Sequence, residues 1–183
     1  MLPLEFVLRR LDNEEKEMAE LVVRYHREEL RSKPKDVVVA TSIGYETIRP
    51  IRRYDVEFKA PGFMLPLKSS VPIPLMDHAV RIFILPNYPF PDDSSRLGAP
   101  IRFEWVTPIF HPNISPGPRY GGTGVVCWDI LKKWVKMFNL KTIVEGLKLL
   151  VSNPNPEDPL RLPPICTQAA EYFKKNPMNP DVS

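Results

Sequence analysis

The sequence is poor in the residue types from which several classes of protein are built. Its 183 residues include two cysteines and three histidines, and neither thiol belongs to a CxxC pair, so neither a disulfide scaffold nor a metal site of standard ligand spacing is expected. No apolar run reaches the roughly 18 residues of a membrane span, and the apolar start of the chain meets Glu5 too early for a secretory signal. We therefore expect a cytoplasmic protein with free thiols, no membrane partner, no metal and no cofactor.

Net charge is small and glycine is scarce. The 25 basic and 22 acidic residues leave a net charge of +3, with no basic stripe, so a nucleic acid is not an implied partner. Glycine occurs 8 times against 22 prolines, which favours rigid, extended connections. With 43% hydrophobic residues the chain can form its own core. We predict one domain over residues 1–175 and a frayed tail over residues 176–183.

Periodicity predicts helices at both ends of the chain and strands between them. Apolar residues recur at helical spacing from Pro3 and predict a long amphipathic helix that ends near residues 32–34. Runs of β-branched and aromatic residues predict strands at 37–39, 54–59, 80–84 and 101–105. No crossover helix separates these strands, so the fold class is α+β. A four-stranded antiparallel meander is flanked by the N-terminal helix and by C-terminal helices at about 141–152 and 165–175.

The helix predicted at 141–152 has one apolar face. Ile143, Val144 and Leu147 share that face, whereas Leu149 falls on the opposite side at about 100° per residue. We expect the apolar face to pack on the sheet and Leu149 to be exposed to solvent. An isolated exposed leucine and a contact with a partner are both open interpretations.

Cys127 is the first candidate for chemistry. It follows a glycine-rich turn at 121–124 and precedes no regular apolar repeat, which is consistent with a thiol that other molecules can reach. The alternative is a buried cysteine that acts as a small hydrophobic residue. Cys166 lies within the predicted 165–175 helix, and we expect it to be buried.

A rigid segment upstream of Cys127 contains His111 and Asn113. Prolines at 108 and 112 bar a regular helix or central strand there, and an amide that is fixed in advance can donate to an oxyanion without reorganisation. Asn113 therefore either stabilises an oxyanion or bonds the backbone of its own turn. His111 is either a base for Cys127, as in a cysteine hydrolase, or a structural hydrogen-bonding residue.

The proline-rich loop at 153–160 carries two carboxylates and follows the predicted 141–152 helix. It is either a solvated turn or, if it folds back toward Cys127, a place where Asp158 orients an attacking amine. Such help matters because a lysine amine, with an unperturbed pKa of about 10.4, is protonated at neutral pH.

Five short blocks follow one another in a set order along the chain. They are Tyr88-Pro89-Phe90-Pro91, Ile101-Arg102-Phe103, Phe110-His111-Pro112-Asn113-Ile114, the segment from Gly124 to Leu131 with Trp134, and the segment from Pro154 to Leu160. Together they resemble the ubiquitin-conjugating enzyme family, over residues 54–160 and more loosely over the first helix. The resemblance implies the family's four-stranded antiparallel meander flanked by helices. It also implies a transferase: an activating enzyme passes the carboxyl end of ubiquitin or a ubiquitin-like modifier to a cysteine, and an amine then attacks that thioester.

The resemblance implies catalytic roles for three residues. Cys127 matches the nucleophile that carries the modifier. Asn113 matches the residue that steadies the oxyanion or the loop around it, and Asp158 matches the acidic gate beside the acceptor. His111 and Asp129 match structural positions near the site. A carrier must resist water yet stay open to an amine, so the lack of an obvious Cys-His-Asp triad fits this chemistry.

Contacts with partner proteins are implied as well. Phe90 and the segment 134–138, with Trp134 and Met137, match loops that family members use for ligases, and exposed aromatic residues there serve as anchors. Leu149 matches the helix against which the carried modifier can be clamped. The implied partners are the modifier, an activating enzyme and a ligase.

Several segments depart from the family pattern. Residues 135–137 replace the usual Ser-Pro-Ala, residues 115–120 form an insertion that could reshape the approach of the acceptor, and residues 66–74 replace a common Gly-Gly hairpin. One helix follows the 141–152 helix where many members have two. These features indicate a divergent or prokaryotic member whose modifier is ubiquitin or ubiquitin-like.

Two other functions stay open at this point. A non-catalytic adaptor on the same fold would bind a ubiquitin-like protein without carrying it. Such relatives typically lack the cysteine, so the presence of Cys127 with Asn113 and Asp158 favours the enzyme, although a fold alone does not establish activity. A cysteine hydrolase would need His111 as an essential base.

Overall fold

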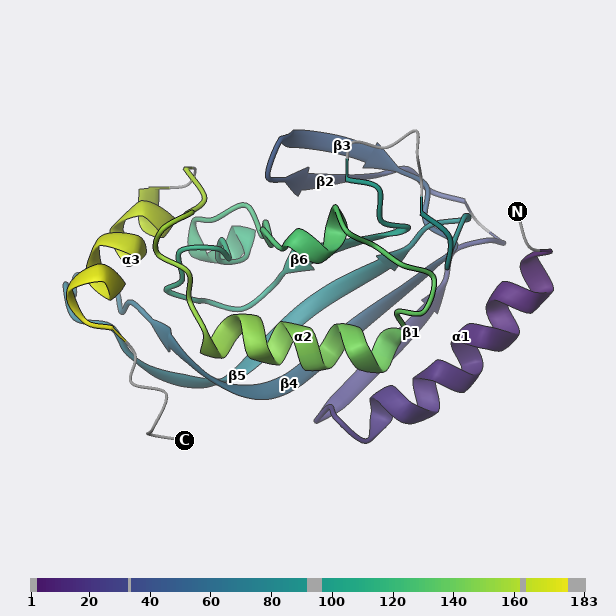
Figure 1. The fold of residues 1–183 in the computed structure, drawn as a ribbon, viewed down its shortest axis with the longest axis horizontal. Coiled ribbons are helices and arrows are strands. Elements are labelled where there is room, and N and C mark those ends of the chain that lie inside the picture. The colour runs from purple at the N-terminus through teal and green to yellow at the C-terminus, as the bar shows by residue number, and fades with distance from the viewer. Residues whose placement is uncertain (1–2, 33, 92–96, 162–163, 178–183) are drawn as a thin grey trace.

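The computed structural model describes residues 3–32, 34–91, 97–161 and 164–177. A twisted sheet forms the centre of the molecule; α2 crosses one face of it, α1 lies beside it and α3 lies toward the opposite end (Figure 1). The elements, in chain order, are α1 (Leu4–Ala19), β1 (Arg24–Glu29), β2 (Val37–Thr41), β3 (Gly44–Ile48), β4 (Arg52–Met64), β5 (Ile73–Ile84), β6 (Ile101–Trp105), the 3-10 helices η1 (Pro118–Tyr120) and η2 (Asp129–Leu131), α2 (Leu140–Ser152) and α3 (Pro164–Lys175).

The main sheet has four antiparallel strands in the order β1-β4-β5-β6. In β4, alternate residues such as Tyr54, Val56 and Phe58 are buried, because strand side chains point alternately to the two faces and one face is covered by α2. The predicted α+β class, with an antiparallel meander flanked by N-terminal and C-terminal helices, is confirmed.

The N-terminal helix is shorter than predicted. α1 ends at Ala19, and residues that were expected to continue it form the edge strand β1 beside β4. Leu21 and Tyr25 extend the helical spacing, and the Arg and Glu residues of this segment are good helix formers, so the local pattern favoured a helix. Pairing overrides that preference: the edge of β4 needs a partner, and ion pairs such as Arg24–Glu57 at 2.7 Å link the two strands.

A separate hairpin stands where one strand of the main sheet was predicted. β2, which contains the predicted strand 37–39, pairs with β3 and not with the main sheet. That assignment is therefore wrong, and β1 takes the fourth place in the sheet. Residues 37–48 are called the hairpin from here on. Alternation of apolar residues identifies a strand but does not say which sheet the strand joins.

The helix α2 begins and ends within one residue of the predicted bounds. Asn139 and Thr142 form a capping box at its start, with the Thr142 amide donating to Asn139 Oδ1 over 2.9 Å. Its inward face packs on the sheet, whereas Leu149 is 65% exposed, as predicted from the helical period. Cys166 on α3 is buried, which is also as predicted.

The predicted tail lies mostly outside the described residues, which end at 177. The amide of Asn176 still donates to the Tyr172 carbonyl over 2.9 Å and so extends the last turn of α3. None of the helices in the described part of the chain is both long and apolar enough to span a bilayer.

Candidate active site around Cys127

Cys127 lies in an irregular segment that backbone hydrogen bonds hold against the end of β6. Its amide donates to the Asn113 carbonyl over 2.9 Å, and the Trp105 amide donates to the Gly124 carbonyl over 2.8 Å. Gly124 has a φ of 73°, a conformation that glycine adopts without strain. The thiol is half-buried and lines a cavity of about 400 Å³.

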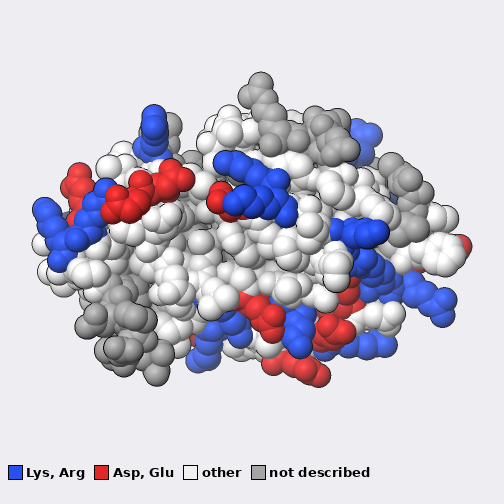
Figure 2. Space-filling model, in the orientation of Figure 1, with Lys and Arg blue, Asp and Glu red and all other residues white. Residues whose placement is uncertain are grey.

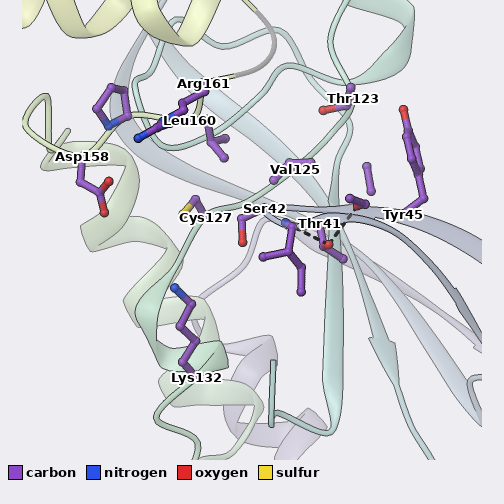
Figure 3. Close-up of a pocket in the computed structure, with 14 residues that line it drawn as sticks. Thr41, Ser42, Tyr45, Thr123, Val125, Cys127, Lys132, Asp158, Leu160 and Arg161 are labelled. Atoms are coloured by element: carbon purple, nitrogen blue, oxygen red, sulfur yellow. Dashed lines mark hydrogen bonds between the residues drawn. The ribbon is translucent and has the colours of Figure 1, made fainter. Parts of the chain in front are cut away.

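The Cys127 cavity has two walls that come from distant parts of the chain. Residues 40–45 at the tip of the hairpin form one wall, called the hairpin wall, and residues 158–161 form the other, called the loop wall. Figure 3 shows the Asp158 carboxylate and the Lys132 ammonium directed toward the space beside Cys127. The lining is completed by Thr123, Val125 and Lys132.

Burial is the largest influence on the Cys127 thiol, and it raises the pKa of that group. The Lys132 ammonium lowers this pKa, the carboxylates of Asp158 and Asp129 raise it, and a hydrogen bond with Ser42 lowers it. The thiol is therefore protonated at neutral pH. Such a sulfur differs from the thiolate of a cysteine hydrolase, which a paired imidazole keeps ionised.

His111 is buried with both ring nitrogens bonded. Nε2 donates to the Leu150 carbonyl at 2.9 Å, and Nδ1 accepts from the Asn113 amide at 3.0 Å. Burial lowers the pKa of this imidazole to about 3, so the ring is neutral at physiological pH. Because neither nitrogen is free to take a proton from Cys127, the geometry disfavours the hydrolase.

Asn113 connects the Cys127 segment to the loop wall. Its side chain is buried, its Nδ2 donates to the Asp158 carbonyl at 2.9 Å, and its Oδ1 accepts from the Asn155 amide at 2.8 Å. The side chain thus bonds the backbone of a distant loop, and not that of its own turn as one interpretation of the sequence held. Asn113 and Asp158 are brought together, with the Asn113 amide engaged in holding the loop.

Asp158 and Asp129 have different surroundings. Asp158 is exposed and lines the Cys127 cavity. Asp129 is exposed too, but its carbonyl accepts from the amides of Lys132 and Lys133 at 2.9 and 3.0 Å, and its carboxylate pairs with Lys133 at 3.7 Å. Asp129 therefore shapes the turn that carries Lys132.

Trp134 is not the exposed anchor that was predicted. It is buried, with its ring 6.0 Å from that of Tyr88 and 5.4 Å from that of Phe138. The indole N–H donates to the Pro89 carbonyl at 2.8 Å, which satisfies its one polar group inside the protein. Trp134 therefore joins the two loops that were expected to meet a ligase.

The other three predicted partner residues are exposed. Met137 is 81% exposed, Leu149 is 65% exposed, and Phe90 is 37% exposed. Met137 and Phe90 lie on the two loops that Trp134 connects, so they belong to one region of the surface, while Leu149 lies on the outward face of α2.

The insertion at 115–120 folds on itself. The Ser115 hydroxyl accepts from the Thr123 amide at 2.8 Å, and a Cβ on Gly122 would collide with the Pro116 carbonyl. The side chains of Pro118–Tyr120 are exposed. As far as the described residues show, none of residues 115–120 lines the cavity. Thr123, which follows the insertion, does line it.

Two groups of lining residues escaped prediction from the sequence. One is the hairpin wall, and the other is the pair of cations Lys132 and Arg161. The segment Ser42-Ile43-Gly44 between two β-branched runs is a hairpin signal that could have been used. No local signal links that turn to Cys127, because the two meet through tertiary packing.

A family model described as ubiquitin-conjugating enzyme matches residues 77–179, more than half of the chain. The chain is similar to the Xenopus laevis protein "Ubiquitin-conjugating enzyme E2 T", with 35% identity over 86 residues, 44% of this chain and 38% of that protein. It is also similar to the Drosophila melanogaster protein "Ubiquitin-conjugating enzyme E2 N", with 36% identity over 87 residues, 47% of this chain and 49% of that protein. The match thus spans less than half the length of either relative.

The fold is similar to that of solved structures as well. A putative ubiquitin-conjugating enzyme from Plasmodium yoelii aligns with a TM-score of 0.55 and 22% identity over 92% of this chain and 84% of that one. The chain therefore belongs to the ubiquitin-conjugating enzyme family. Within the described ranges, no group of three or more His, Cys, Asp and Glu side chains is placed to hold a metal ion.

Proposed function

We propose that this chain is a conjugating enzyme that carries ubiquitin or a ubiquitin-like modifier as a thioester on Cys127 and transfers it to a lysine amine. The observation that carries the proposal is the half-buried Cys127 thiol in a cavity that it shares with the Asp158 carboxylate, with no base on the sulfur among the described residues.

Two exchanges at one carbonyl carbon make up the reaction. First, the Cys127 sulfur attacks the modifier's carboxyl carbon on the activating enzyme; a new C–S bond forms, and the departing thiolate takes the proton that Cys127 releases. Then the acceptor nitrogen attacks the same carbon, a C–N bond forms, and the bond to Cys127 breaks. The proton lost by the amine returns to the sulfur, whose pKa is raised by burial, and the neutral thiol is restored.

Asp158 serves the second exchange. A lysine arrives as an ammonium, and a carboxylate in the cavity can hold that group beside the thioester and accept a hydrogen bond as the nitrogen loses its proton. Asn113 supports this step by fixing the loop wall through its hydrogen bonds to the Asp158 carbonyl and the Asn155 amide. A neutral, fully bonded His111 leaves water without a base, which protects the thioester.

The exposed residues suit protein partners. Figure 2 shows charged side chains of both signs scattered over this face with uncharged surface between them, and no continuous basic patch, which favours a protein over the phosphate backbone of a nucleic acid. Leu149 on α2 is suited to clamp the carried modifier, and Phe90 with Met137 to meet an activating enzyme or a ligase. Two free thiols fit a reducing compartment such as the cytosol.

The test is a charging assay. The chain is incubated with ATP, an activating enzyme and a panel of fluorescent modifiers, beginning with ubiquitin, and is separated on a non-reducing gel. We expect a thiol-sensitive adduct that Cys127→Ala abolishes, that Cys127→Ser converts to a more stable oxyester, and that the matched control Cys166→Ala retains. No adduct with any competent activating enzyme and modifier would favour the non-catalytic adaptor.

A further inference from the structure

The hairpin has no part in the reaction as described so far, yet its tip forms a whole wall of the Cys127 cavity. The residues of this wall run from Ala40 to Tyr45, and they belong to the hairpin, which lies between β1 and β4 in the chain. In Figure 3 they lie across the cavity from Asp158. An element that stands beside the reacting sulfur limits what can approach it.

The hairpin is held firmly on the main sheet. Val39 and Ile48 pack against Phe83 and Leu85. Glu46 accepts two hydrogen bonds from the buried Arg102 guanidinium, at 2.6 and 2.9 Å. A bidentate pair of this kind fixes orientation as well as distance, so the tip is a supported wall.

The hairpin wall also reaches the reacting residue. Ala40 packs in one apolar cluster with Cys127, Val125 and Leu160, and Ser42 lines the same cavity as the thiol. The cluster makes the interior of the cavity apolar close to the sulfur, while Asp158 provides a negative charge at its edge. An aliphatic stem that ends in an amine matches both features.

The outer part of the hairpin tip offers an apolar contact. Ile43 is 53% exposed and Tyr45 is 76% exposed, and both line the cavity. An aromatic ring beside an open cavity is a common anchor for a protein partner. We have assigned the binding of the carried modifier to Leu149 on α2. The exposed side chains of the hairpin wall are therefore available to bind the acceptor protein.

Two cations outside the hairpin wall, Arg161 on the loop wall and Lys132, give the cavity a charge preference. Lys132 and Arg161 line the cavity, and neither forms a salt bridge within the described residues. A carboxylate next to the acceptor lysine would find a partner in one of them, while the lysine itself meets Asp158.

We propose that the hairpin tip, through Ile43 and Tyr45 and together with Lys132 and Arg161, selects the acceptor: a lysine of a protein segment with an acidic residue close to it. This inference rests on the proposed function of Cys127. It assigns the choice of substrate mainly to the hairpin and the charging of the sulfur to the rest of the molecule.

The experiment is a single-turnover discharge assay on full-length chain that has been charged with fluorescent ubiquitin, or with whichever modifier charges Cys127. The acceptors are free lysine and two peptides with one lysine each, flanked by aspartates or by arginines. For Tyr45→Ala we expect unchanged charging, unchanged discharge to free lysine, and about fivefold to tenfold slower discharge to the aspartate peptide. Val38→Ala is the matched control, because Val38 is 64% exposed on the same hairpin and does not line the cavity.

A charge reversal tests the second half of the proposal. We expect Arg161→Glu to remove the preference for the aspartate peptide over the arginine peptide, measured as the ratio of the two discharge rates. The proposal is overturned if Tyr45→Ala slows free lysine and peptide equally, if it slows neither, or if wild type uses both peptides at the same rate. A wild-type chain that never charges would instead refute the proposed function, and this inference with it.

Discussion

The two walls of the Cys127 cavity are built on different principles. The loop wall is an irregular segment whose backbone is held by the buried Asn113 side chain, which donates to the Asp158 carbonyl, and by the Leu160 amide, which donates to the Pro112 carbonyl. The hairpin wall is a regular two-stranded element that a buried guanidinium and an apolar cluster attach to the sheet. The hydrogen bonds of the neutral Asn113 amide are directional and fix the backbone only where they form. The ion pair of Glu46 with Arg102 and the apolar cluster under the hairpin hold the whole hairpin on the sheet, and so support its protruding tip.

This difference indicates a division of roles. The loop wall carries Asp158, to which we assign a role in the reaction itself, and Asn113 holds both the Asp158 carbonyl and the Cys127 amide. The hairpin wall carries exposed side chains that we assign to substrate choice. Loss of the Asn113 hydrogen bonds should therefore impair the reaction with every acceptor, and damage to the hairpin wall should impair only some acceptors.

Acid should weaken the loop wall first and most. The pKa of His111 is about 3 in the folded chain and about 6.5 when unfolded, so its contribution to stability is complete above about pH 6.5 and is lost as the pH falls toward 3. The expected loss is about 1.4 kcal/mol per pH unit, or about 3 kcal/mol near pH 4.5. Urea unfolding from pH 7.5 to 4.5 measures it. His111→Gln should flatten the slope, and the exposed-residue control His26→Gln should not; equal slopes in all three proteins would contradict the assignment.

Asn113→Ala removes the hydrogen bonds that hold the loop wall. We expect a loss of about 2 kcal/mol in the free energy of unfolding, since each bond contributes about 1 kcal/mol. Charging should persist, and discharge to free lysine and to peptides should slow by a similar factor. Asn153→Ala is the matched control, because the Asn153 side chain donates to the Leu149 carbonyl at an exposed position. Normal discharge by Asn113→Ala would mean that the loop needs no such support.

Glu46→Gln weakens the attachment of the hairpin wall. The Glu46 side chain is 33% exposed, so its pair with Arg102 is partly screened, and we expect a loss of about 1 kcal/mol. Discharge to free lysine should be unchanged while discharge to the aspartate peptide slows. Asp36→Asn breaks the exposed pair with Arg49 at the base of the same hairpin and should leave stability nearly unchanged, because solvent screens this pair. Loss of free-lysine discharge in Glu46→Gln would erase the distinction between the walls.

The smallest effect is expected at Lys132, between the walls. This ammonium lowers the pKa of the Cys127 thiol, so Lys132→Met should slow alkylation of Cys127 by iodoacetamide about twofold at neutral pH. In both proteins the alkylation rate should rise about tenfold per pH unit at pH values below the raised pKa of the thiol, because the fraction of thiolate rises by that factor. Buried Cys166, whose pKa is raised to about 12, should react slowly, and Lys133→Met is the control. Identical alkylation rates in wild type and Lys132→Met would show that the Lys132 charge does not affect the Cys127 thiol.

Sequence reasoning recovered the parts of the molecule that local periodicity and motif order define. The bounds of α2, the exposure of Leu149 and the antiparallel class followed from side-chain spacing. The convergence of Cys127 and the Asp158 segment was expected from the order of motifs. Each of these depends on residues near in sequence, or on a resemblance that spans the site.

What the sequence did not reveal depends on contacts between distant segments. The polar, charged residues of β1 have a helical pattern, but pairing with the edge of β4 makes them a strand. Trp134 was expected to be an exposed anchor, but it is buried with its N–H bonded to the Pro89 carbonyl. The hairpin wall was missed because its meeting with Cys127 is set by the packing of Val39 and Ile48 on the sheet. The pattern of apolar residues within 37–48 therefore cannot predict the contact between the hairpin and Cys127.

Among the described residues, the backbone ladder of the hairpin pairs β2 with β3 and is separate from the ladder of the main sheet. Residues can therefore be added at or removed from the turn around Ser42 without shifting any residue of the central strands. If the hairpin tip selects the acceptor as we propose, changes in that turn would alter the choice of acceptor while the sulfur and its supporting sheet stay as they are. The two properties could then vary separately.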